Sequence, residues 1–424
     1  MRARHESCAF GTLHLLHRFT KQGSGDHFRI TDMKLSLFFL VLGYLLSQFY
    51  RSFLAVLSGL LQADTGVTAD DLAFASGLWF LTFALAQLPI GWSLDRFGPR
   101  RTTALMLGLG GTGGAVIFAL AQNALHVHLA MAALGVGCAP VLMASYYIFA
   151  RSFPPAIFAT LAGAVIGFGS LGNILGALPM AWAAEAFGWR ESILAIGVIT
   201  AIVSVVIWIV VQDPPQAEAP DGAKGSVLDI LRIPAVWLLL PLLMVNYAPA
   251  AGLRGLWVGP YYTDVYGATA TGIGQVTLLM ALAMIAGNFA YGPLDRILGT
   301  RKGVVLGGNL LGAVCLFVLA FFPLAGFWQA GLLLAAVGFF GASFPMIMAH
   351  GRSYVPAHLT GRGVTFLNLC SIGGVGVLQV LSGRVHASAA STPPETAYQT
   401  LFLFFAVLLL IGCIIYAFTT DRTD

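Results

Sequence analysis

The sequence predicts an all-α membrane protein in which twelve transmembrane helices form two pseudo-symmetric six-helix bundles. Three observations lead to this prediction: a composition poor in charge, a series of long apolar runs, and an internal repeat. Of the 424 residues, 58% are hydrophobic and only 9% are charged, whereas about a quarter of the residues in soluble domains are charged. Too few charges are present to cover a surface that faces water.

The apolar residues occur in runs of about 20, the length that an α-helix needs to cross about 30 Å of hydrocarbon. A transmembrane β-barrel would instead show segments of about ten residues with alternating polarity. Windows of about 19 residues predict two sets of six spans, at 35–62, 72–94, 102–121, 126–149, 157–181 and 190–211, and at 234–262, 272–294, 302–323, 328–351, 361–383 and 397–418.

One long polar segment separates the two sets of spans. It runs from Gln212 to Arg232, and its prolines and glycine break any regular structure. We therefore expect a linker between two halves. The predicted parts are a disordered cytoplasmic segment at 1–34, an N-terminal bundle at 35–211, a cytoplasmic linker at 212–233, a C-terminal bundle at 234–418 and a cytoplasmic tail at 419–424.

The positions of Lys and Arg predict the orientation, because positive charge is retained on the cytoplasmic side during insertion. With the N-terminus inside, 18 of the 22 Lys and Arg residues fall in inward termini and loops. Both termini are then cytoplasmic, and we expect a multi-pass protein of a bacterial inner membrane. The formal net charge of +4 is explained by this topology, so we expect no nucleic-acid partner.

Three short motifs recur at a shift of about 200 residues. Transporters are often built from such duplicated bundles, and three matches at the same shift are hard to obtain by chance. The pairs are 91–96 with 292–296, 150–155 with 351–356, and Thr65-Gly66 and Thr68-Ala69 with Tyr266-Gly267 and Thr269-Ala270.

The loop after the second span reads Gly91-x-x-x-Asp95-Arg96-x-Gly98-x-Arg100-Arg101. It is similar to the signature between helices 2 and 3 of the major facilitator superfamily, which the chain resembles over essentially its whole length. The resemblance implies a solute site near the midplane between spans 1, 4, 7 and 10, and alternating access by rocking of the bundles. It also implies an inner gate made of Asp95, Arg96, Arg100, Asp295 and Arg296, although the charged loop could act only as a topology anchor.

Two strong charges fall well inside predicted helices, Arg51 in the first span and Arg254 in the seventh. An arginine at the centre of a helix costs about 2.5–3.5 kcal/mol on insertion scales, and no Asp or Glu lies at this depth. We therefore expect both side chains to face a polar cavity. Tyr44 and Tyr247 precede the arginines by seven residues, which on a straight helix places each about 10 Å away on the same face.

Two guanidinium groups in one cavity repel each other, and an anion between them relieves the repulsion while accepting forked hydrogen bonds. We therefore predict a small organic anion, a carboxylate or an organophosphate, as the transported solute. The alternative is that each arginine extends toward the headgroups or bonds a helix carbonyl. The candidate substrate-binding residues are Arg51, Arg254, Tyr44, Tyr247, Gln48, Tyr146, Tyr147, Trp79 and Trp257.

The segment from Gln48 to Val56 resembles the first-helix pattern of the anion:cation symporter branch, and paired arginines on helices 1 and 7 also resemble the organophosphate:phosphate antiporters. In the symporter pattern an acidic residue associated with proton coupling precedes the arginine, but Tyr50 stands there. His350 is another candidate proton site, because imidazole changes charge near neutral pH, or else a hydrogen-bonded structural residue. Symport, antiport and facilitated diffusion stay open, with a proton or a counter-anion as the coupled ion.

Two other functions are compatible with the sequence. Some copper importers of this superfamily use Met and His pairs, and thioether and imidazole ligands on one helix face suit Cu(I); the set here is Met280, Met284, Met346 and His350. Ordinary packing is the simpler explanation, and nearby arginines would oppose a cation. A membrane receptor on a transporter fold is the second alternative. No nucleotide-binding or catalytic motif is present, so we expect no cofactor and no enzymatic activity. We also expect a monomer in the lipid bilayer.

Overall fold

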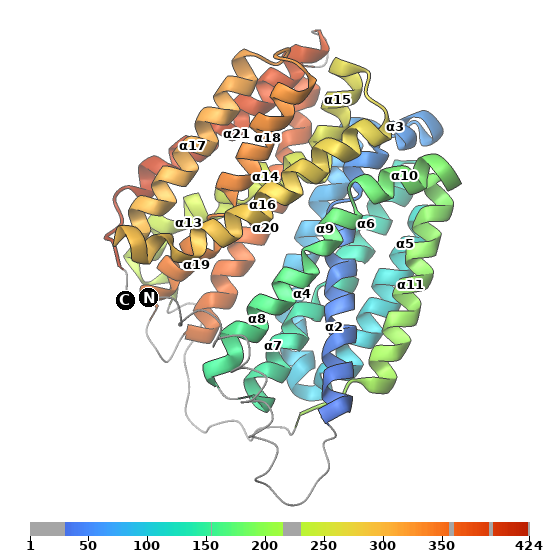
Figure 1. The fold of residues 1–424 in the computed structure, drawn as a ribbon, viewed down its shortest axis with the longest axis vertical. Coiled ribbons are helices and arrows are strands. Elements are labelled where there is room, and N and C mark those ends of the chain that lie inside the picture. Colours follow the sequence, from blue (N-terminus) through green and yellow to red (C-terminus); the bar gives the residue numbers. More distant parts are fainter. Residues whose placement is uncertain (1–29, 154, 215–229, 356–359, 390–392, 423–424) are drawn as a thin grey trace, which may run out of the picture.

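The computed structural model describes residues 30–153, 155–214, 230–355, 360–389 and 393–422. Within these residues the chain is helical, and the helices are gathered into two groups (Figure 1). Most of the predicted N-terminal segment and of the predicted linker lies outside the described residues.

The first group consists of the helices between residues 30 and 210. Its elements are α2 (Ile30–Tyr50), α3 (Leu54–Thr65), α4 (Ala69–Met106), the π-helical η2 (Leu107–Thr112), α5 (Gly113–Ala119), α6 (Ala124–Cys138), α7 (Pro140–Ser152), α8 (Pro155–Gly169), α9 (Leu171–Leu175), α10 (Leu178–Phe187) and α11 (Trp189–Val210).

The second group follows the linker and has a matching order. Its elements are α13 (Pro234–Asn246), α14 (Ala248–Gly252), the π-helical η3 (Leu253–Trp257), α15 (Val258–Tyr266), α16 (Ala270–Leu298), α17 (Arg301–Phe321), α18 (Phe327–Gly341), α19 (Phe344–Ser353), α20 (Thr360–Ser388) and α21 (Pro394–Tyr416).

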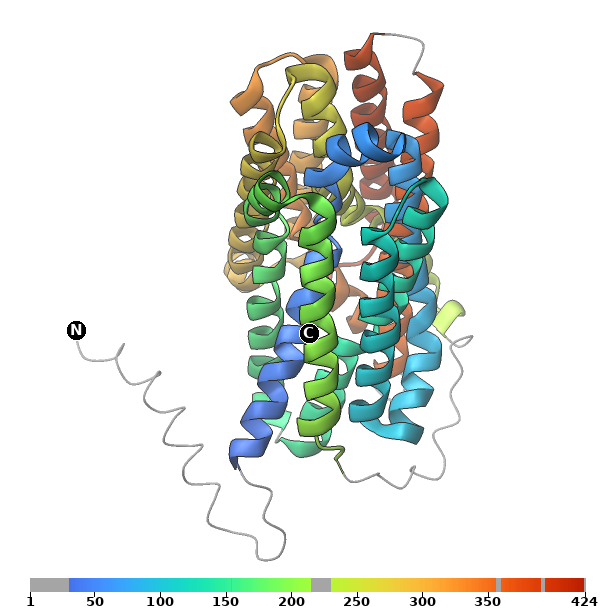
Figure 2. The same ribbon diagram turned by 90° about the vertical axis from the view of Figure 1, so that its right-hand side faces the viewer.

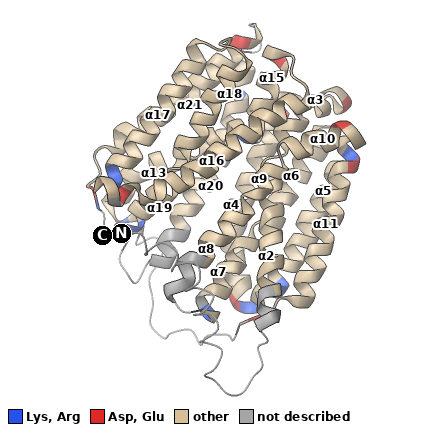
Figure 3. Cartoon of the chain, in the orientation of Figure 1, with Lys and Arg blue, Asp and Glu red and all other residues tan. Residues whose placement is uncertain are grey.

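The described helices account for the twelve predicted spans. Ten of them are long and apolar enough to cross a membrane, and the bent pair α2 and α3 adds another. One of the ten runs for 51 residues, Ala69–Ala119, which as a straight helix would be about 75 Å long, more than twice the hydrocarbon thickness. It contains two spans, because Gly98 interrupts it with φ 81° and ψ 164°. In Figure 3 most charged residues gather at the ends of the helices.

The internal repeat corresponds to equivalent turns. Gly66 with φ 69° and Gly267 with φ 61° end the first and seventh spans in the left-handed region, which favours glycine. Two residues later, the hydroxyls of Thr68 and Thr269 accept backbone hydrogen bonds and cap α4 and α16. The third repeated motif therefore encodes the same turn and helix start in both halves, as the repeat predicts.

The first span is not the straight helix that the sequence analysis assumed. Its two parts, Leu35–Tyr50 and Leu54–Thr65, meet at an angle of 51°, and α3 lies across the top of the bundle in Figure 2. Arg51 lies in the break between them, so the expected helical spacing between Tyr44 and Arg51 is wrong. Arg254 lies in the π-helical turn η3, so Tyr247 and Arg254 are not on one regular helix either.

The two bundles meet at one end of the molecule and diverge toward the other. We call the end that holds Gly66, Glu185 and Gly267 the outer end, and the end that holds Asp95 and Asp295 the inner end. Contacts between the bundles join α4 to α20, α10 to α16 and α3 to α15. In Figure 1, α16 is close to α10 at the outer end and separates from the run α8 to α9 toward the inner end.

Glycines allow the bundles to approach closely at the outer end. A Cβ on Gly77 of α4 would lie 2.5 Å from a methyl carbon of Val380 on α20. A Cβ on Gly259 of α15 would lie 2.1 Å from the carbonyl oxygen of Ala55 on α3. Side chains at these positions would force the bundles apart, so the glycines make the closed outer end sterically feasible.

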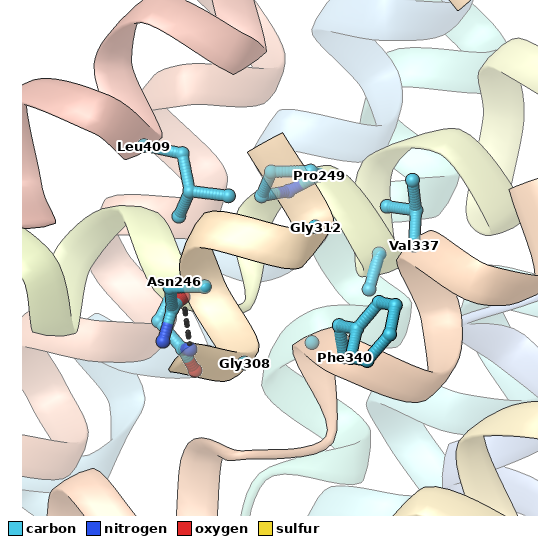
Figure 4. A pocket seen from close by; sticks show the side chains of 10 residues that line it. Asn246, Pro249, Gly308, Gly312, Val337, Phe340 and Leu409 are labelled. Carbon is cyan, nitrogen blue, oxygen red and sulfur yellow. Dashed lines mark hydrogen bonds between the residues drawn. The ribbon is translucent and has the colours of Figure 1, made fainter. Parts of the chain in front are cut away.

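The C-terminal bundle also contains a small cavity of about 10 Å³, lined by residues of α13, α14, α17, α18 and α21 (Figure 4). The amide of Asn246 on α13 donates to Asn309 on α17 and to Ser343 beside α19. Asn246 Oδ1 has no partner in the described structure, and a space of this size is near the lower limit for one water molecule. This polar network ties three helices of the C-terminal bundle together.

The close crossing of α6 and η2 predicts a stability difference between two glycine substitutions. A Cβ on Gly137 would lie 2.2 Å from the backbone nitrogen of Gly111, whereas a Cβ on Gly113 meets nothing within 4 Å. Gly137→Ala should destabilise the protein by about 1–3 kcal/mol, because backbone cannot yield as a side chain does, and should lower the thermal unfolding midpoint in detergent. Gly113→Ala is the control, and equal midpoints for the two variants would contradict this account of the crossing.

Candidate functional site

Arg51 is surrounded by aromatic rings of α4. Its guanidinium carbon lies 4.9 Å from the ring centroid of Trp79, 5.4 Å from that of Phe83 and 5.7 Å from that of Phe80. Ring faces attract a cation, most strongly when it is desolvated. The Nε atom of Arg51 is buried without a hydrogen-bond partner in the described structure, so the rings stabilise the charge while leaving donor capacity unused.

Arg254 is almost completely buried, with 1% of its surface exposed. Pro249 and Gly252 weaken the regular helix before it, and the chain forms the π-helical turn η3 at this point. Its Nε and Nη2 atoms have no hydrogen-bond partner among the described residues, while the Tyr247 hydroxyl is close enough to interact with the guanidinium. A buried cation with free donors is costly unless a ligand compensates it.

The two arginines lie close enough that their charges repel each other. The approach is made possible by Gly255, where a Cβ would lie 3.2 Å from the carbonyl oxygen of Arg51. The Tyr44 hydroxyl interacts with both Arg51 and Tyr247. The first and seventh spans therefore place Tyr44, Arg51, Tyr247 and Arg254 near one another at the boundary between the bundles.

Gln48 and Tyr146 extend this group of polar side chains. The amide nitrogen of Gln48 donates to the Tyr44 hydroxyl at 2.9 Å, which leaves Gln48 Oε1 buried without a partner. Tyr146 on α7 is near enough to interact with Tyr44. Trp79 Nε1, in the ring that covers Arg51, is likewise buried and unpaired in the described part of the chain. Both donors and an acceptor are thus available around the arginines.

The carboxylates that could have neutralised the arginines are engaged elsewhere. Asp64 pairs with Arg190 and accepts from the indole of Trp189, and Glu185 accepts from the backbone nitrogen of Thr271. Asp264 accepts from the hydroxyl of Tyr398. Among the salt bridges of the described residues, none includes Arg51 or Arg254.

Two predicted substrate-binding residues have other interaction partners. Trp257 is fully buried, and its indole donates to Ser382 at 2.8 Å while its ring lies beside His386 near the outer end. Tyr147 lies toward the inner end, where Arg151 is 4.2 Å from its ring centroid.

The predicted inner-gate residues form pairs within each bundle. Asp95 lies 3.6 Å from Arg151, and Asp295 lies 3.2 Å from Arg301. Arg96 instead lies over the rings of Trp92 and Phe97. The side chain of Arg296 lies outside the described residues.

Two aspartates that the sequence analysis missed cap equivalent helices at the inner end. Asp213, just after α11, accepts from the backbone nitrogen of Arg100 at 2.8 Å. Asp421, after α21, accepts from that of Lys302 at 3.0 Å. Burial acts to raise the pKa of Asp421, but hydrogen bonds from Thr300 and Lys302 outweigh it, so the pKa is lowered. An aspartate shortly after the sixth span of each half was the signal available in the sequence.

His350 is engaged through both ring nitrogens. Nδ1 bonds the Tyr416 hydroxyl, and Nε2 lies 3.0 Å from the carbonyl oxygen of Thr420. These contacts favour a structural role that fastens α19 to α21. Of the copper candidates, Met284 packs against Gly338 of α18.

Comparison with known proteins agrees with this architecture. A family model described as Major Facilitator Superfamily matches residues 40–256 and 244–424, which together cover most of the sequence. The chain belongs to the major facilitator superfamily of transporters. Its paired bundles and its span order are those of a superfamily member, and it is a multi-pass membrane protein.

The chain is similar to several transporters at low identity. It is 23% identical to the sialic acid transporter NanX of Escherichia coli (strain K12), over 80% of this chain and 84% of that protein. It is 24% identical to the probable L-galactonate transporter of the same organism, over 91% and 86%. The match to the uncharacterized transporter YybO of Bacillus subtilis (strain 168), at 25% identity, spans 41% of this chain and 39% of that protein.

A solved structure has a similar fold. It is a bacterial homolog of the human lysosomal transporter Spinster, with a TM-score of 0.73 and 16% identity, covering 93% of this chain and 97% of that one.

The capping role of Asp213 predicts a selective loss of stability. Asp213→Ala should destabilise the start of the third span by about 1 kcal/mol, because the backbone nitrogen of Arg100 loses its acceptor. Asp213→Asn should stay close to the wild type, since asparagine is an equally good cap. Thermal unfolding midpoints of the purified variants measure the difference, and identical midpoints for the two substitutions would rule out the cap.

Proposed function

We propose that this protein is a secondary active or facilitative transporter of a small organic anion, with Arg51 and Arg254 binding the anion between the two bundles. The observation that carries the proposal is the pair of neighbouring guanidinium groups with unused donors and no carboxylate partner in the described residues. Arg254 is buried at 1% exposure, and an anion bound beside it would offset the cost of burying its charge.

The surrounding groups favour a hydroxylated carboxylate over a simple ion. Guanidinium groups present parallel N–H donors that match the two oxygens of a carboxylate. The unpaired Gln48 Oε1 can accept from a hydroxyl group, and the unpaired Trp79 Nε1 can donate to one. The named cargoes of two relatives, sialic acid and L-galactonate, are both hydroxylated carboxylic acids. We therefore favour a sugar-acid-like carboxylate over an organophosphate.

We infer that the conformation described above is the inward-facing one. The positive-inside distribution of Lys and Arg assigns the inner end to the cytoplasm of a bacterial cell, and the bundles diverge toward that end. Contacts such as those of Gly77 and Gly259 close the outer end. Rocking of the bundles about the arginine pair would break these contacts and close the inner end, which is the alternating-access mechanism.

Several modes of ion coupling are compatible with the described residues. Tyr50 occupies the position where the symporter pattern has an acid, and its hydroxyl is hydrogen-bonded to Thr200 at 2.9 Å. The contacts of His350 favour fixation of α21 over proton exchange. A counter-anion, a proton carried with the substrate, and uncoupled transport by a monomer are each compatible with the site.

Removing either arginine should abolish anion transport. Arg51→Ala and Arg254→Ala should each lower counterflow of L-galactonate or sialic acid in proteoliposomes by at least about 30-fold, because the carboxylate loses a charged, forked donor. The matched control is Arg384→Ala, since Arg384 is exposed at the outer end. Counterflow at the wild-type rate in either Arg51→Ala or Arg254→Ala would contradict the proposal that both arginines bind the anion.

The inner gate predicts a change in conformational balance. Asp95→Asn should weaken the pair with Arg151 and alter the balance between inward-facing and outward-facing states. Opening of the outer end is measured with the variant Ala73→Cys in a background free of other cysteines, labelled with a membrane-impermeant reagent. Ala73 is fully buried on α4 where it faces α20. Asp295→Asn should have a smaller effect, because its motif departs from the signature. Unchanged labelling in Asp95→Asn would argue that the loop is only a topology anchor.

A further inference from the structure

A histidine at the outer end joins the two bundles. His386 lies in the last turn of α20, and its Nδ1 atom is 3.2 Å from a carboxylate oxygen of Asp70 in the first turn of α4. The two residues belong to different halves of the chain, 316 positions apart. Neither the anion site nor the inner gate uses them.

The imidazole is fixed in its own bundle by aromatic rings. The rings of Trp257 and Tyr398 lie 4.8 Å and 5.1 Å from it. These contacts, from η3 and α21, orient the imidazole so that Nδ1 meets Asp70 across the boundary. The side chain of His386 is 13% exposed and that of Asp70 is 37% exposed, so protons reach the pair from the outer face.

The other titratable or charged groups near His386 come from three elements. Tyr398 on α21 faces the imidazole, and its hydroxyl donates to Asp264 on α15. Arg384 lies two residues away on α20 and is exposed, and Glu395 lies one turn before Tyr398. Asp70 is the carboxylate in direct contact with the ring. The charge of the imidazole therefore acts chiefly through Asp70.

We infer that Asp70 and His386 form a proton-binding latch that favours closure of the outer end. An imidazolium bound to a carboxylate makes a charge-assisted hydrogen bond about twice as strong as a neutral one. The contact joins the bundles where they must separate for the outer end to open. Histidine changes charge between about pH 5 and pH 8, so acid at the outer face shifts the population toward the closed outer end.

A second contact makes the latch partial. Glu185 on α10 accepts from the backbone nitrogen of Thr271 in the first turn of α16, and this contact also joins the bundles at the outer end. It contains no histidine, so it can persist when His386 is neutral. The latch therefore adjusts the fraction of closed molecules instead of switching all of them.

The experiment measures the opening of the outer end directly. Spin labels are attached to Leu125→Cys on α6 and Phe322→Cys after α17, two exposed positions near the outer end in different bundles, in a cysteine-free background. Double electron–electron resonance in lipid nanodiscs without substrate gives the ratio of short to long distances. We expect this ratio to rise about fivefold from about pH 8 to about pH 5.5, which is the effect expected of one partly exposed charge pair on the population ratio.

Two variants assign the response to the latch. His386→Asn and Asp70→Asn should each abolish the pH dependence while both distances stay populated. His128→Asn is the matched control, because His128 is also near the outer end but bonds the backbone oxygen of Asp71 within its own bundle; it should keep the full response. A wild-type ratio that does not change with pH, or a full response in His386→Asn, would overturn the latch.

The inference rests on the alternating access proposed above and not on the identity of the cargo. A single distance under every condition, including added L-galactonate, would contradict alternating access itself. Two distances that interconvert without pH dependence would contradict only the latch. Counterflow by the arginine variants tests the anion site separately.

Discussion

The arrangement of this protein depends on two guanidinium groups that lie close together within a membrane-spanning bundle pair and lack carboxylate partners in the described chain. Their mutual repulsion and the burial of Arg254 would destabilise a protein that had no use for them. Three rings of α4 offset part of this cost for Arg51. We propose that a bound anion takes up the remaining donor capacity.

The helical breaks at the arginines and the glycines around them serve the same arrangement. Arg51 lies between α2 and α3, and Arg254 lies in a π-helical turn. The backbone at both places departs from the regular hydrogen-bond pattern of an α-helix. Gly255 and Gly259 let the seventh span approach the first within backbone contact. The same close approach that brings the charges together also seals the outer end, so the proposed binding region and the closed end are parts of one interface.

The sequence alone predicted the repeat and the membrane spans, because these follow from patterns that can be read along the chain. The caps of Thr68 and Thr269 can be recognised from the residues next to them in the sequence. A run of apolar residues long enough to cross a bilayer can be recognised in the same way. The break at Arg51 was not predicted, since no proline or glycine marks Tyr50 to Phe53. Asp213 was missed because the backbone nitrogen that it caps is 113 residues away.

Charge, hydropathy and duplication, all readable along the chain, determined the class of protein and its two arginines. Tertiary structure decided which groups share a space. It paired the indole of Trp257 with Ser382 and the ring of Tyr147 with Arg151. It also gave Asp64, Glu185 and Asp264 other partners, and it brought Asp70 to His386 across the bundle boundary. The physical reason is that partners of a side chain in a bundle are fixed by helix crossings and breaks, which join residues far apart in sequence and leave no local pattern.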